Sequence, residues 1–138
     1  MSTAAERPLT VLVYSDDAAV RAAVIAALGR RPAADLPLVE CHEFATEPAL
    51  IRRLEQGGVD LAVLDGEAVP SGGMGISRRM KNEIYGAPPV LLLTGRRDDA
   101  WLATWSQAEA VVPHPIDPVL LAQAAAALLR PRLAVTGS

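Results

Sequence analysis

The stretch TVLVYSDD, Thr10 to Asp17, passes from an apolar run directly to a pair of acids. Its apolar part, Val11 to Tyr14, is too short for a helix and is rich in residues that favour strands. We therefore predict a buried strand with a polar carboxyl end. A helix is expected next, because apolar residues recur at helical spacing from Val20 to Leu28 and Gly29 follows as a stop signal.

Predicted strands and helices continue to alternate along the rest of the chain. Further strands are predicted at residues 37–44, 59–65, 88–94 and 110–112, and further helices at 47–58, 76–84, 98–110 and 117–129, the last with Asp117 as its N-cap. Five strands alternating with five helices predict an α/β fold, a doubly wound five-stranded parallel sheet flanked by five helices. The domain is expected to span residues 8–130, with loose tails at 1–7 and 131–138.

Composition narrows the class of protein. The chain has 138 residues, 51% of them hydrophobic, which is enough for one domain with a real core. A net charge of −3 gives no electrostatic reason to expect direct nucleic-acid binding. The longest apolar runs are too short to span a membrane, and the N-terminus lacks the apolar segment of a signal peptide. The single cysteine, Cys41, cannot form an internal disulfide, so we expect a cytoplasmic protein.

Polar residues follow four of the five predicted strands. Function in such a sheet belongs at the carboxyl ends of the strands, and six polar residues are expected there: Ser15, Asp16, Asp17, Asp65, Thr94 and His114. His114 stands between Pro113 and Pro115, which stiffen the loop that carries it. We therefore predict that carboxylates, a hydroxyl and the imidazole of His114, which is a cation only when protonated, meet at one edge of the sheet.

This set resembles the active site of response-regulator receiver domains, especially single-domain receivers of the chemotaxis type. Members of that family carry an acidic pair after the first strand, a phosphoaccepting Asp after the third, Thr or Ser after the fourth and Lys-Pro after the fifth. With Arg21 matched to a common basic position of the first helix, Ser15 and Asp16 fall at the acidic pair, and Asp65, in LAVLDGEAVPSGG, falls at the phosphoacceptor. The resemblance covers nearly the whole chain and implies the flavodoxin-like receiver fold.

The resemblance also implies roles for single residues. Asp65 would be the nucleophile that forms an aspartyl-phosphate, and Thr94 would hydrogen-bond a phosphoryl oxygen. Mg²⁺ would be held by Asp16, Asp65 and the backbone carbonyl of Glu67, with Asp17 as a further candidate ligand. Activity would be limited to self-phosphorylation and dephosphorylation at Asp65, with a sensor histidine kinase or another protein as the partner.

Three departures from the family pattern make this an atypical receiver. Ser15 is neutral where the family has an acid, so Mg²⁺ binding is expected to be weak or absent. His114 replaces the lysine, and Val111 stands where many receivers have a switching aromatic residue. Glu67 adds an acid that could help a metal or repel a phosphate. The alternative function is a phosphorylation-independent pseudo-receiver that acts as a protein-binding adaptor; a flavodoxin-like cofactor binder would explain the sheet but not the acids.

Two tryptophans mark the predicted fourth helix. Trp101 and Trp105 are four residues apart, so they belong either to the core or to a partner-facing patch beside Ala122 or Ala126. In the resembling family this helix is a common output surface, and a homodimer through the fourth and fifth helices is one expected use of it. His42 is expected to be a half-exposed residue of the second strand.

Overall fold

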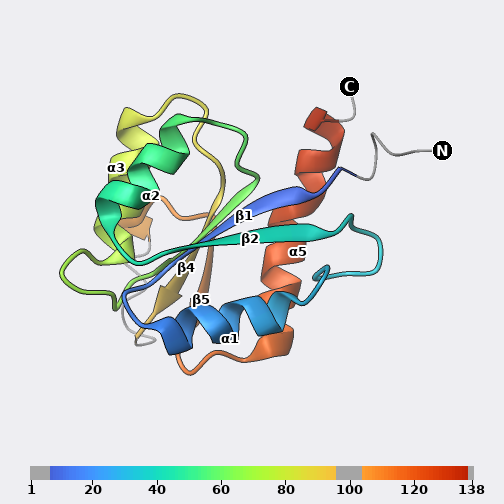
Figure 1. The fold of residues 1–138 in the computed structure, drawn as a ribbon, viewed down its shortest axis with the longest axis horizontal. Helices are drawn as coiled ribbons and strands as arrows, with labels where there is room; N and C mark the ends of the chain where they lie inside the picture. The colour runs from blue at the N-terminus through green and yellow to red at the C-terminus, as the bar shows by residue number, and fades with distance from the viewer. Residues whose placement is uncertain (1–6, 96–103, 137–138) are drawn as a thin grey trace.

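The sheet has five parallel strands in the order β2-β1-β3-β4-β5, which confirms the predicted doubly wound α/β fold (Figure 1). The computed structural model describes residues 7–95 and 104–136. Its strands are β1 (Leu9–Tyr14), β2 (Val39–Phe44), β3 (Leu61–Asp65), β4 (Val90–Thr94) and β5 (Ala110–Pro113). All four pairings are parallel, so all five strands end at the same edge.

Helices cover both faces of the sheet. The named helices of the described ranges are α1 (Ala18–Leu28), α2 (Glu47–Glu55), α3 (Gly73–Glu83) and α5 (Pro118–Thr136). Helices α1 and α5 pack on one face, and α2 and α3 pack on the other (Figure 1). None of the helices in these ranges combines the length and apolar character that crossing a bilayer demands.

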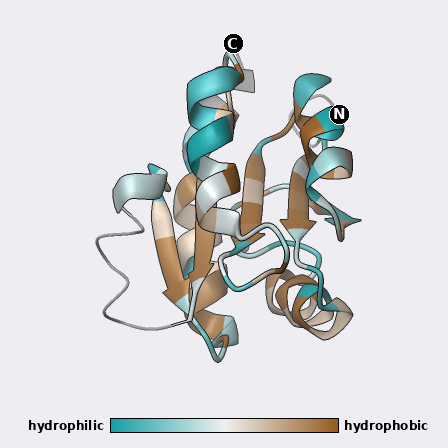
Figure 2. Ribbon diagram, turned by 90° about the vertical axis from the view of Figure 1, so that its left-hand side faces the viewer, coloured by the Kyte–Doolittle hydropathy of each residue, from teal (hydrophilic) through white to brown (hydrophobic). Residues whose placement is uncertain are grey.

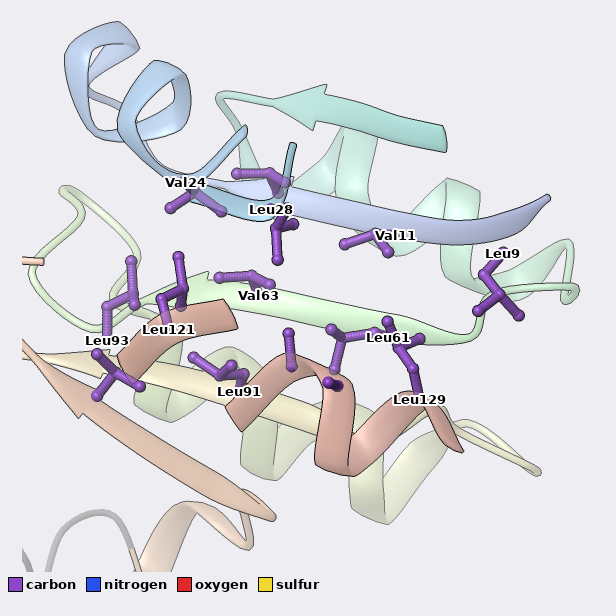
Figure 3. Close-up of a cluster of buried hydrophobic side chains, with 14 of the residues drawn as sticks. Leu9, Val11, Val24, Leu28, Leu61, Val63, Leu91, Leu93, Leu121 and Leu129 are labelled. Carbon is purple, nitrogen blue, oxygen red and sulfur yellow. The ribbon is translucent and has the colours of Figure 1, made fainter. Parts of the chain in front are cut away.

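Alternation along the central strands divides the core into two clusters. In β1, Val11 and Val13 face α1 and α5, whereas Leu12 and Tyr14 face α2 and α3. Successive side chains of a strand point to opposite faces, so a strand covered on both sides reads as a continuous apolar run. Figure 3 shows the first cluster, and Figure 2 shows several strands largely in the brown of hydrophobic residues.

Strand β2 is the least apolar strand because it lies at the edge of the sheet. Its side chains are half-buried or exposed along the whole strand. His42 is partly exposed and lies 3.4 Å from Glu40 Oε1, which agrees with the expectation of a half-exposed sheet residue. Charged groups on an edge strand also discourage pairing with another chain.

The predicted caps are present at two helix starts. Asp117 Oδ1 accepts hydrogen bonds from the backbone N–H groups of Val119 and Leu120, which confirms it as an N-cap. Asp17 Oδ1 accepts from the N–H of Ala19 at the start of α1. Helix α1 ends at Gly29, whose φ of 59° suits a residue without a Cβ.

Helix α5 does not end where the sequence predicted. We expected it to stop at residue 129 and residues 131–138 to form a loose tail, but the helix continues through Pro131 to Thr136. Ion pairs hold the extra turns: Arg130 Nε lies 2.8 Å from Asp35 Oδ2, and Arg132 Nε lies 3.6 Å from Asp60 Oδ1. Leu133, in the turn after Pro131, also packs against the core cluster of α1 and α5, and its burial offsets part of the backbone hydrogen bond that a proline inside a helix removes.

The predicted fourth helix falls largely outside the described residues, since 98–103 are among those not described. Residues 104–106 are helical, and Gln107 has a φ of 65°. The expected end at residue 110 was therefore wrong, because β5 begins there. Helix α3 binds this segment: Ser77 Oγ donates to the carbonyl of Ser106 at 2.8 Å, and Lys81 Nζ lies 2.6 Å from Glu109 Oε2.

Candidate functional site

A pocket of about 340 Å³ lies at the carboxyl ends of β1, β3, β4 and β5. Its lining residues are Asp16, Asp17, Val20, Asp65, Glu67, Gly95 and His114. The structure thus brings together four of the six side chains that the sequence placed at this edge: Asp16, Asp17, Asp65 and His114. Four of the lining side chains are carboxylates, which makes the pocket favourable for a cation and unfavourable for a bare anion.

Asp65 is the most enclosed carboxylate of the pocket, with 3% of its surface exposed. Its Oδ1 accepts a hydrogen bond of 2.9 Å from the backbone N–H of Glu67 and lies 3.1 Å from His114 Nε2. Its Oδ2 accepts a hydrogen bond of 2.8 Å from the hydroxyl of Ser15. A carboxylate offers about four acceptor positions, and three of those of Asp65 are therefore engaged.

Ser15 is fully buried, and its side chain is held on both sides. While its hydroxyl donates to Asp65, the hydroxyl oxygen accepts a hydrogen bond of 3.0 Å from the N–H of Asp17. The backbone carbonyl of Ser15 accepts a hydrogen bond of 2.6 Å from Arg21, which also pairs with Glu43 at 2.9 Å. Arg21 was identified from the sequence as a match to the family pattern, and here it fixes the backbone that carries Ser15.

Asp16 and Asp17 line the pocket, and the side chain of each also accepts a hydrogen bond from a backbone N–H group nearby. Asp16 Oδ1 accepts a hydrogen bond of 3.1 Å from the N–H of Val69, in the loop that follows β3. Asp17 caps helix α1, so its Oδ1 is already used. Tyr14 fixes the loop after β3 as well, because its hydroxyl donates a hydrogen bond of 2.6 Å to the carbonyl of Ser71. The loops after β1 and β3 therefore hold each other in place.

Thr94 and His114 come from neighbouring strand ends. The N–H of His114 donates to the carbonyl of Thr94 at 2.7 Å, and the peptide bond between His114 and Pro115 is cis. Thr94 is buried, with 2% of its surface exposed. His114 keeps 23% of its side chain exposed and is the member of the pair that lines the pocket.

Gly95 has a role that the sequence reasoning missed. A Cβ at this position would lie 2.5–2.6 Å from the carboxyl atoms of Glu67, so the Glu67 side chain rests directly over the Gly95 backbone. The signal for this was a glycine directly after the hydroxyl residue in LLLTG. Any side chain at position 95 would displace Glu67 from this wall of the pocket.

The pKa of the Tyr14 hydroxyl is raised by its surroundings. Burial raises the pKa of the Tyr14 hydroxyl, and the carboxylate of Glu47, followed by those of Asp16 and Asp65, raises it further. The hydroxyl therefore stays protonated and remains a donor to the Ser71 carbonyl.

The predicted Mg²⁺ ligands do not form a ready metal site. Within residues 7–95 and 104–136, no three His, Cys, Asp or Glu side chains form a group that could hold a metal ion. The oxygens of Asp65 face donor groups, and Asp16 Oδ1 is bound to a backbone N–H. The carboxylates therefore do not converge as a set of ligands for the octahedral geometry that Mg²⁺ requires.

Trp105 is 44% exposed, so it is not a core residue. The guanidinium of Arg78 lies 4.8 Å from the centroid of its ring and also donates to its backbone carbonyl at 2.8 Å. Trp101 lies outside the described residues. Of the two expected alanine neighbours, Ala126 of α5 is buried in the core, so its predicted place in a surface patch was wrong.

Comparisons with known proteins agree with this architecture. No family model matches the chain. Two sequences named uncharacterized response regulatory protein, from Mycobacterium tuberculosis strains CDC 1551 and H37Rv, are each 54% identical over 122 residues, covering 88% of this chain and 92% of theirs.

Solved structures show the same fold at low sequence identity. The BeF3-activated DrrB receiver domain superposes with a TM-score of 0.73 at 21% identity, over 89% of this chain and 98% of that one. The chemotaxis response regulator CheY4 of Vibrio cholerae gives 0.73 at 17% identity, over 89% and 100%. A receiver domain from Bermanella marisrubri gives 0.75 at 19% identity, over 90% and 100%. With more than half of its aligned residues identical to the mycobacterial relatives along most of both chains, the protein belongs to the response regulator family and has the fold of its receiver domain.

Proposed function

We propose that this receiver domain is a phosphoryl acceptor in a cytoplasmic two-component relay and that Asp65 is the residue modified. Response regulators act in two-component signal transduction, and their receiver domains interact with histidine kinases. The observation that carries the proposal is the place of Asp65, whose carboxylate forms part of the wall of the pocket at the strand ends. Ser15, Glu67 and His114 hold that carboxylate in one orientation.

The reaction is a transfer from nitrogen to oxygen. An oxygen of Asp65 attacks the phosphorus of a kinase phosphohistidine, the P–N bond breaks, and the departing imidazole takes up a proton. His114, which lines the pocket, supplies a hydrogen bond to a phosphoryl oxygen, and the family resemblance assigns a second one to the hydroxyl of the buried Thr94. Receiver domains typically bind Mg²⁺, but the donors around Asp65 here do not fit that ion, so we assign no step to a metal.

Intact mass spectrometry tests this assignment. The protein is incubated with phosphoramidate, a small phosphodonor that mimics phosphohistidine, and the modified residue is located by peptide mapping. We expect a single phosphoryl adduct that is absent from Asp65→Asn. The matched control is Asp35→Asn, because Asp35 is an exposed acid paired with Arg130 outside the pocket and its loss should leave the adduct unchanged.

The hydrogen bond from Ser15 to Asp65 favours a second candidate function. Because the acceptor positions of Asp65 are mostly engaged and three further acids line the pocket, the domain could serve as a phosphorylation-independent adaptor. Trp105, Val119 and Leu120 are exposed apolar residues that would form the contact surface for a protein target or for a second copy of this chain. A chain that stays unmodified by phosphoramidate but still binds its target supports the adaptor.

A further inference from the structure

The hydrogen-bond donors around Asp65 stand where a cation would be expected. Two partners, the Ser15 hydroxyl and the Glu67 N–H, present hydrogens to its oxygens, and His114 Nε2 lies 3.1 Å from Oδ1. A buried carboxylate is stabilised either by such donors or by a bound cation, because burial without a partner is costly. Here the donors already meet that need.

The direction of the Ser15 hydroxyl is not free to change. A serine hydroxyl has one proton and two lone pairs. The N–H of Asp17 occupies one lone pair, and the Asp65 carboxylate can only accept, so the proton is directed to Asp65. The side chain is fully buried, and Arg21 holds its backbone carbonyl. The positive end of the hydroxyl dipole therefore lies between Ser15 and Asp65, where a metal ion would need a lone pair.

Asp16 does not compensate for the missing acid. Its Oδ1 accepts a hydrogen bond from the N–H of Val69, in the loop that follows β3. The carboxylates of the pocket thus surround one space, but they do not converge on one point.

We propose that Ser15 makes the Asp65 site complete without a divalent cation, and that the residue at position 15 determines whether this pocket binds one. Ser15 is then a specificity-determining residue for metal. Replacing it with an acid would place a second carboxylate beside Asp65, and two buried like charges require a cation or a proton between them. This inference concerns cation binding alone and stands whether or not Asp65 accepts a phosphoryl group.

Isothermal titration with Mg²⁺ and Mn²⁺, without any phosphodonor, compares the wild type with Ser15→Asp and Ser15→Asn. Asparagine has the shape of aspartate and no charge, so it controls for size. We expect Ser15→Asp to bind both ions at least about tenfold more tightly than the wild type, because the added carboxylate would contribute a full negative charge beside Asp65. Ser15→Asn should resemble the wild type. Thermal unfolding with and without Mg²⁺ should show a midpoint shift in Ser15→Asp only.

Two results would overturn the inference. One is a wild-type protein that binds Mg²⁺ as tightly as Ser15→Asp does, with binding lost in Asp16→Ala. The other is a Ser15→Asp protein with native circular dichroism that gains no affinity. If Ser15→Asp fails to fold without metal, the wild-type titration still decides, because tight wild-type binding contradicts the claim and negligible binding supports it. Phosphoramidate labelling is measured separately, so failure of the proposed phosphoryl transfer would not be mistaken for failure here.

Discussion

Gly73 lies directly against the backbone of Asp65, so that a Cβ at position 73 would come within 2.9 Å of the Asp65 carbonyl. This contact fixes the start of α3 at the strand end that carries the acceptor. We expect Gly73→Ala to lower the free energy of unfolding by about 1–3 kcal/mol, because the backbone of β3 cannot yield easily. Urea denaturation measures the change.

Gly75→Ala is the matched control in the same helix, because a Cβ there would meet no atom within 4 Å. Its stability should stay the same or rise by about 0.5–1 kcal/mol, as alanine favours a helix more than glycine does. Equal losses for the two variants would contradict the close approach of α3 to β3.

His114→Lys should increase the phosphoryl adduct formed with phosphoramidate. A lysine carries a compact permanent charge on a longer and more flexible side chain, so it can reach and pair with a phosphorylated Asp65. Intact mass measured over time gives the rate. His114→Gln is the comparison, since it keeps a polar side chain without positive charge and should label no faster than the wild type. If His114→Lys leaves Asp65 unmodified, the adaptor becomes the better reading of the domain.

Asp60 should contribute more to stability than Asp35, although each pairs with an arginine of α5. Asp60 is 7% exposed, and its Oδ2 also accepts a hydrogen bond of 2.9 Å from the N–H of Thr10. We expect Asp60→Ala to cost about 1–3 kcal/mol, because the partly buried N–H of Thr10 loses its partner. Asp35 is exposed, so Asp35→Ala should cost only a small fraction of that amount. Chemical denaturation of the two variants measures both losses of unfolding free energy. A larger loss for Asp35→Ala than for Asp60→Ala would contradict the prediction.

Cys41 should react slowly with thiol reagents in the folded protein. Burial raises the pKa of its thiol, and the negative charge of Glu43 raises it further, so less thiolate is present at a given pH. Absorbance during reaction with a disulfide reagent at pH 7 should show a rate several times lower than in urea, and the folded-state rate should climb as the pH increases. A folded protein that reacts as fast as the unfolded chain would show that the thiol is accessible.

Strand positions were predictable because both faces of the central strands are covered. A run such as Val11 to Tyr14 has no polar residue, and its abrupt end at Ser15 marks the edge of the sheet. The end of α5 was not predictable from local signals. Pro131 indicates a stop, but the ion pairs of Arg130 and Arg132 with residues far away in sequence extend the helix.

The gathering of Asp65 and His114 followed from topology, since parallel strands end at one edge. The hydrogen bond between Ser15 and Asp65 could not be predicted from topology, because it depends on the register of β1 against β3 and on the direction of the Ser15 hydroxyl. From the sequence, Ser15 was a lost metal ligand. In the structure its hydroxyl instead donates a hydrogen bond to Asp65, the proposed phosphoryl acceptor.

The network around Asp60 has a practical consequence for anyone who wishes to label this domain. Asp60 joins the start of β1, through Thr10, to the last turns of α5, through Arg132, at the edge of the sheet opposite the pocket (Figure 1). A fluorescent protein or an affinity handle attached before β1 or after α5 would therefore emerge on the side away from Asp65. Such fusions would leave the pocket open to a kinase, and a pair of fluorophores placed there would report on assembly of the domain with a second copy.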